Sequence, residues 1–159
     1  MSDSVLHLVV QLGRDRYVLA ASQVLEIITV VRLKPLPGAP IGVAGLMNYR
    51  GSAVPVVDLA LVATGTPVSP TTAARIVVLQ FPVPSRPGEH DALGLLVAAA
   101  HDTVRLDPQD FVDSGVVAGG APCFGLVLAT PDGVLQRVEP AVLLTPELRA
   151  ALFRRAEGA

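Results

Sequence analysis

The sequence predicts a mainly β protein built in two halves, and three observations lead to this prediction. About ten short segments either alternate between apolar and polar residues or are rich in β-branched residues, as strands are. A small, polar, proline-bearing stretch at residues 64–73 divides these segments into two groups. Only residues 145–156 have the pattern of a longer helix. At 159 residues the chain is about one domain long and is expected to bury a core without disulfides.

The first part of the chain alternates in a way that predicts a hairpin followed by a third strand. The elements expected there are, in order, strands at 6–12 and 16–20, a short helical turn at 23–25 capped by Ser22, a strand at 26–33 and an extended proline-rich loop at 34–40.

The stretch 42–59 predicts two apolar strands, 43–47 and 53–59, joined by a tight turn at residues 48–51 (NYRG). Asn and Gly tolerate positive φ, which such turns require. Pro55 cannot donate a hydrogen bond to a neighbouring strand, so the second strand is expected at a sheet edge or to be irregular there. Arg50 lies in this turn between two buried strands, which indicates either a functional guanidinium or one that caps carbonyl groups of its own turn.

The second half contains further short strands and ends in the helix. The expected elements are a strand at 75–81, a loop at 82–91, an apolar segment at 93–100, short strands at 104–106, 116–117, 123–129 and 134–138, and the helix at 145–156 with Thr145 as its N-cap. The segment 93–100 fits a buried strand or a short helix, and Gly94 favours the strand.

Composition excludes several classes of partner. The net charge is −2, aromatic residues make up 4% and Trp is absent, so neither a basic stripe nor a set of stacking aromatics indicates nucleic-acid binding. No uninterrupted apolar run reaches the roughly 18 residues of a membrane helix. Hydrophobic residues make up 51% and charged residues 16%, which fits apolar surface covered by partners or, equally, a compact Val/Ala/Leu-rich core. We expect a cytoplasmic protein, because no signal peptide is recognisable and Cys123 is the single cysteine.

Residue types that carry chemistry are present but not grouped. His7, His90 and His101 lack ligand spacing, so no metal site is expected. His101 beside Asp102 could form a general base with its orienting carboxylate, although surface polarity is the more ordinary reading. Cys123 is expected to be an inert core thiol rather than a nucleophile. Because no phosphate-binding loop is present either, we expect no cofactor and no enzymatic activity.

Several motifs resemble those of one family. Residues 45–51 (GLMNYRG) followed by 54–59 (VPVVDL) resemble the signature of CheW-like proteins, which join chemoreceptors to a histidine kinase in bacterial chemosensory arrays. Residues 24–27 (VLEI) resemble the V-x-E-I of that family, 37–40 its proline element, and 93–97 (LGLLV) its second-half strand. The resemblance extends over nearly the whole chain, from about residue 6 to residue 152.

The resemblance implies two SH3-like five-stranded β-barrel subdomains with a short helix and a C-terminal helix. It implies a single CheW-like domain at 5–157, with residues 5–63 in the first barrel, packed with the helix at 145–156, residues 64–72 as a linking loop, and residues 73–140 in the second barrel. It further implies a non-catalytic adaptor without cofactors, found in the cytoplasm at membrane-associated receptor arrays. Alone, such a protein is expected to be a monomer.

The resemblance also assigns residues to two partners, the cytoplasmic tip of a methyl-accepting chemoreceptor and the regulatory domain of a CheA-type kinase. The residues implied at or near the receptor groove are Val24, Glu26, Gly45, Asn48, Arg50 and Leu93. Those implied near the kinase surface are Val54, Val56 and Asp58. Glu26 and Arg50 have opposite charges at matched family positions, so we expect them to pair at the rim of the groove.

Two features depart from the family pattern. Ala98 stands where the family commonly has Asp, and the strand at 134–138 is more polar than usual, so the second barrel is expected to meet its partner differently.

The pathway in which the protein works is left open among swimming chemotaxis, pilus motility and surface sensing through cyclic-di-GMP. The alternatives are a regulatory protein-binding module that does not bridge receptor and kinase, and a small enzyme that uses Cys123 or His101.

Overall fold

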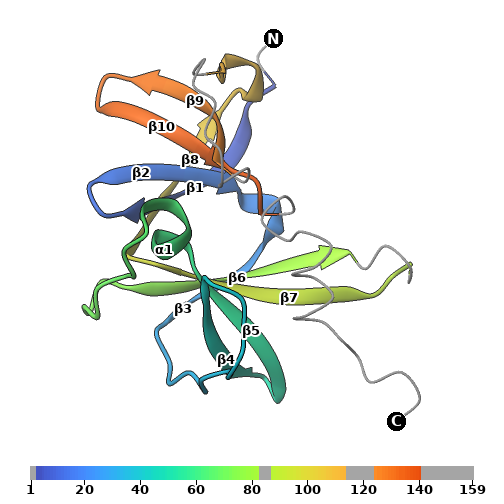
Figure 1. The fold of residues 1–159 in the computed structure, drawn as a ribbon. Helices are drawn as coiled ribbons and strands as arrows, with labels where there is room; N and C mark the ends of the chain where they lie inside the picture. The colour runs from blue at the N-terminus through green and yellow to red at the C-terminus, as the bar shows by residue number, and fades with distance from the viewer. Residues whose placement is uncertain (1–2, 83–86, 114–123, 141–159) are drawn as a thin grey trace.

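The computed structural model describes residues 3–82, 87–113 and 124–140. Within these ranges the chain forms two five-stranded sheets, which lie one above the other in the view of Figure 1. Sheet A has the strand order β8-β1-β2-β10-β9 and sheet B the order β3-β6-β7-β5-β4. The prediction of a mainly β protein with two five-stranded units is confirmed.

Sheet A combines strands from both ends of the chain. Its strands are β1 (Val5–Leu12), β2 (Asp15–Ala20), β8 (Ala99–Leu106), β9 (Phe124–Thr130) and β10 (Gly133–Val138). Sheet B uses the middle of the chain. Its strands are β3 (Val24–Thr29), β4 (Val43–Tyr49), β5 (Ser52–Asp58), β6 (Arg75–Pro82) and β7 (His90–Val97). Three short helical segments complete the description: η1 (Ala21–Gln23), α1 (Leu59–Thr64) and η2 (Pro108–Asp110).

The division of strands between the two units differs from the expectation. We expected residues 5–63 and 73–140 to form separate barrels, but each sheet takes strands from both sides of residues 64–72. Parallel ladders join β2 to β10 and β5 to β7, and these pairings link segments far apart in sequence. Hydrophobic periodicity identifies strands but not their partners, which is why the division was wrong. The extent of the domain, 5–157, stays a prediction.

The apolar segment 93–100 is not one strand. It ends β7 at Val97 and begins β8 at Ala99, with a break at Ala98, whose N–H donates to the carbonyl oxygen of Gln11 at 3.0 Å. The break moves the chain from sheet B to sheet A.

The helical turn after β2 also begins earlier than expected. Ser22 lies inside η1, and the N-cap of η1 is Ala20.

Pro55 lies in an interior strand rather than at the sheet edge. Leu46, the partner of Pro55 on β4, directs its main-chain hydrogen bonds to Lys34 on the far side. In an antiparallel ladder such a pair exchanges no hydrogen bonds, so the donor that proline lacks is not needed on that side. On the other side, the ladder with β7 begins only at Val56. The edge prediction was wrong because the interruption of one ladder is sufficient to accommodate the proline.

Both sheets contribute to one core. Its buried side chains are Leu8, Val10, Leu12, Tyr17, Leu19, Val57, Leu59, Ala60, Val77, Leu79, Leu93, Leu95, Val97 and Val138. The helix α1 contributes Leu59 and Ala60, contacts β1 and β7, and lies between the two sheets in Figure 1. This helix was not predicted from the sequence.

Three expectations concern residues outside the described ranges: the strand at 116–117, the core thiol of Cys123 and the helix at 145–156.

Candidate functional site

The turn between β4 and β5 consists of Arg50 and Gly51, and both have positive φ, 50° and 85°. Positive φ at both central residues is the pattern of a type I′ turn, whose twist matches that of the flanking strands. Asn48 does not take the positive φ we expected of it. It lies in β4, and its Oδ1 accepts a hydrogen bond from the Gly51 N–H at 3.0 Å, which fixes the turn from the side.

The turn places Arg50 and Tyr49 against Glu26 of β3. Arg50 Nη2 donates to Glu26 Oε2 at 3.1 Å, and the Tyr49 hydroxyl donates to the same oxygen at 2.6 Å. The Arg50 guanidinium also lies 5.2 Å from the centre of the Tyr49 ring, within the range of a cation–π contact. The expected pairing of Glu26 with Arg50 is present. Tyr49 is an addition that the sequence did not reveal, and we call these three residues the Glu26 cluster.

The Glu26 cluster is open to solvent. The side chains of Arg50 and Glu26 are 76% and 39% exposed, so water screens their attraction and the pair contributes at most about 1 kcal/mol to stability. The hydrogen bond to Glu26 raises the pKa of the Tyr49 hydroxyl above its ordinary value, so the hydroxyl keeps its proton and remains a donor at neutral pH. The cluster therefore presents a fixed arrangement of charges at low cost to the fold.

Gly45 has a structural role at the edge of β4. It lies in a β-bulge with φ of 150°, and a Cβ atom there would stand 2.5 Å from the carbonyl oxygen of Lys34. Lys34 and Leu46 exchange two main-chain hydrogen bonds, both 2.8 Å long. The missing side chain at Gly45 therefore allows the chain after β3 to pair with β4, which joins the two edge strands of sheet B.

The two apolar residues expected at the receptor groove differ in exposure. Val24 is half-buried and packs against the shared core, whereas Leu93 is fully buried within it. The Leu93 side chain is thus not available as a groove wall in this structure. Leu25 and Ile27, which precede and follow Glu26 in the chain and are not indicated by the family motifs, are 50% and 41% exposed. Exposure alternates along β3, so residues 25 and 27 face the opposite side of the strand from Glu26. The polarity of the sequence does not alternate in the same way, and it therefore gives no signal that these two apolar residues are exposed.

The residues expected near the kinase surface are all buried. Val54 and Val56 are 4% and 0% exposed and pack in the core of sheet B. Asp58 is 5% exposed and caps α1: its Oδ1 accepts from Leu61 N and its Oδ2 from Val68 N, each at 3.0 Å. These side chains hold strand β5 and the start of α1 in place, and none forms an open contact surface.

Asp58→Ala is expected to lower the free energy of unfolding by about 2–4 kcal/mol, because it leaves two main-chain N–H groups without their buried acceptor. Urea denaturation followed by circular dichroism measures the loss. Asp107→Ala is the matched control, since Asp107 caps η2 through one bond to Gln109 N and is only half-buried. Its loss should be about 1 kcal/mol or less. Equal losses in the two variants would contradict the structural role of Asp58.

The part of the chain that the structure describes holds no group of three or more metal-ligating side chains. His101 is hydrogen-bonded to Gln11, with 2.9 Å between Nε2 and Oε1, rather than to Asp102. This contact favours the reading of His101 as surface polarity. Within the same ranges, no helix is long and apolar enough to span a membrane.

Comparisons with known proteins agree with this architecture. A family model described as "CheW-like domain" matches residues 6–145. Among solved structures, the chain is similar to the scaffolding protein TtCheW from Thermoanaerobacter tengcongensis, with a TM-score of 0.76 and 21% sequence identity. The alignment covers 93% of this chain and 91% of that one, so the two share a fold. The comparison with curated proteins found no match.

Proposed function

This chain belongs to the CheW-like domain family, and we propose that it is a non-catalytic adaptor coupling methyl-accepting chemoreceptors to a CheA-type histidine kinase. The observation that carries the proposal is the Glu26 cluster. It joins two of the motifs on which the resemblance rests, V-x-E-I and N-x-R-G, and it leaves their charged side chains on the surface. In the cell, such an adaptor would work in the cytoplasm, at the receptor arrays.

The surroundings of the Glu26 cluster suit a protein partner. β3 is an edge strand of sheet B, so Leu25 and Ile27 offer apolar area on one face of this edge, while Glu26 and Arg50 offer charges on the other. Burial of apolar area supplies affinity in such interfaces, while charges at the rim reject wrong partners. Val24, Glu26, Asn48 and Arg50 are therefore proposed as the receptor-facing set, extended by Leu25 and Ile27.

The remaining assigned residues would act indirectly. Gly45 and Leu93 would maintain the strands behind the receptor-facing surface. Gly45 permits the close approach of the main chain at Lys34, and Leu93 fills the core. Val54, Val56 and Asp58 would likewise hold β5 and α1 beneath the surface that meets the kinase.

A pull-down with the receptor tip and the kinase regulatory domain from the same genome tests the proposal. Wild type should capture both partners. Arg50→Ala should lose receptor capture at least about tenfold while its melting temperature stays close to that of wild type, because the ion pair is exposed. Arg14→Ala, in the exposed turn between β1 and β2, is the matched control and should bind as wild type does.

A charge exchange separates recognition from internal pairing. The double variant Glu26→Arg with Arg50→Glu keeps an ion pair within the protein but inverts the charges that a partner meets. If the partner reads these charges, receptor capture stays lost. Recovery of capture would show that only the internal pair matters. Capture of the kinase alone would favour a regulatory module that does not bridge, and capture of neither partner would overturn the coupling role.

A further inference from the structure

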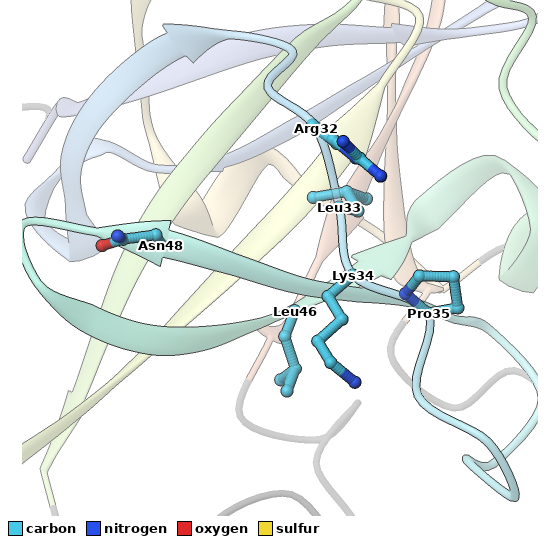
Figure 2. A pocket seen from close by; sticks show the side chains of 6 residues that line it. All are labelled: Arg32, Leu33, Lys34, Pro35, Leu46 and Asn48. Carbon is cyan, nitrogen blue, oxygen red and sulfur yellow. The ribbon is translucent and has the colours of Figure 1, made fainter.

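A hollow lies where sheet B is incompletely closed. After β3 the chain runs back along the outer edge of β4 and pairs with it at Lys34 and Leu46. In antiparallel register the next facing residues are Arg32 and Asn48, and no hydrogen bond joins them. Figure 2 shows the chain turning away from β4 between Lys34 and Arg32. The hollow has a volume of about 350 Å³, and its lining residues are Arg32, Leu33, Lys34, Pro35, Leu46 and Asn48.

The edge of β4 carries main-chain groups without partners at this hollow. Successive residues of an antiparallel strand direct their N–H and C=O groups alternately to the two sides. Leu46 directs its groups outward to Lys34, so Asn48, two residues further along, also directs its groups outward. No main-chain hydrogen bond from Asn48 to that side is present among the described residues. An unpaired strand edge is a template for an added strand.

The side chains around the hollow add charge and apolar surface. Arg32 and Lys34 are exposed, and within the described ranges neither makes an ion pair or a side-chain hydrogen bond. Leu33 and Leu46 are half-buried and, with Pro35, supply apolar lining. These features complement an extended acidic segment. The open strand edge can form hydrogen bonds with its main chain, and the two unpaired cations can form ion pairs with a carboxylate side chain, next to the apolar lining.

We propose that this hollow binds an extended acidic segment of a partner protein, added as a short strand to β4 at Asn48, with a carboxylate side chain between Arg32 and Lys34. The proposal does not depend on which protein the adaptor couples. A second copy of this chain is disfavoured as the occupant, because an isologous contact would bring the cations of both copies together.

The proposal is tested by nuclear magnetic resonance on the full-length ¹⁵N-labelled protein. The probe is a short capped peptide of alternating valine and glutamate, and the matched probe replaces glutamate by lysine. The acidic peptide should shift the amide signals of residues 32–34 and 46–48, and the basic peptide should not. The double variant Arg32→Glu with Lys34→Glu should weaken binding at least about tenfold. The control variant Arg14→Glu with Arg16→Glu, in and beside the exposed β1–β2 turn, should bind as wild type does.

Each other outcome overturns the proposal. Equal shifts with the basic peptide would mean that apolar contact alone drives binding. Equal shifts with sodium acetate, at the same carboxylate concentration, would mean a simple anion site. Shifts that appear without peptide as the protein is concentrated would identify a second copy as the occupant. Shifts elsewhere, or none, would exclude strand addition at β4. These results leave receptor and kinase capture through the Glu26 cluster as a separate question.

Discussion

Gly45→Ala should lower the free energy of unfolding by roughly 2–4 kcal/mol. Two causes act together. The φ of 150° at Gly45 is a conformation that residues with a Cβ atom rarely adopt. The added Cβ would also stand 2.5 Å from the Lys34 carbonyl oxygen. That oxygen accepts the Leu46 N–H at 2.8 Å, so it cannot move away without breaking the pairing that joins the edges of sheet B.

Gly125→Ala is the matched control for this prediction. Gly125 also lies in an outer strand, β9, but a Cβ atom there meets nothing within 4 Å, and its φ is not positive. Its substitution should change the free energy of unfolding by about 0.5 kcal/mol or less. Urea denaturation compares the two variants. A Gly45→Ala protein as stable as the control would show that the Lys34 segment can yield without cost.

Leu93→Ala should cost about 2–5 kcal/mol of stability, because it removes a fully buried side chain from the core that both sheets share. The family resemblance implied a groove wall at this position, and the two roles predict different results. A core residue changes the urea midpoint, while receptor capture by the protein that remains folded is unchanged. A groove residue would lower receptor capture with little effect on stability.

Leu25→Ala is the counterpart of Leu93→Ala and should show the opposite pattern. Leu25 is 50% exposed on β3 and directly precedes Glu26 in the chain. Its truncation should cost less than about 1 kcal/mol of stability and reduce receptor capture. The pair is measured by urea denaturation and by pull-down at a temperature where both variants are folded. If Leu25→Ala unfolds and Leu93→Ala loses only receptor capture, then Leu25 is the core residue and Leu93 the contact residue, which contradicts both assignments.

The sequence predicts the strands better than it predicts their partners. Alternation and β-branched runs locate most strands to within a few residues, because both signals are local. Strand pairing is a long-range property, and nothing local indicates that β2 pairs with β10. The helix α1 was missed although its signals are present: Asp58 as N-cap, then six residues without Gly or Pro, and Gly65 as C-cap. These signals were overlooked because the apolar run of β5 continues into the helix, and the boundary between strand and helix was therefore not recognised.

The candidate site shows a similar division. The family motifs led to Glu26, Asn48 and Arg50, and the structure pairs Glu26 with Arg50 and places Asn48 at the turn that carries Arg50. They did not indicate which apolar neighbours face outward, because that depends on the register of β3 in the folded sheet. The positive φ of Arg50 also escaped prediction, since Asn and Gly are the usual residues in such a conformation. The third member of the cluster, Tyr49, stands at the variable position of N-x-R-G.

The interleaving of the two sheets imposes an order on folding during synthesis. All strands of sheet B lie between residues 24 and 97, so that sheet is complete once its last strand has left the ribosome. The first strands of sheet A must wait for β8, β9 and β10, because Arg16 pairs with Leu135 near the other end of the described chain. Contacts between such distant residues close large loops and form slowly. In the nascent chain, the strand edges of the β1–β2 hairpin therefore stay unpaired longest, which makes this segment the most prone to aggregation.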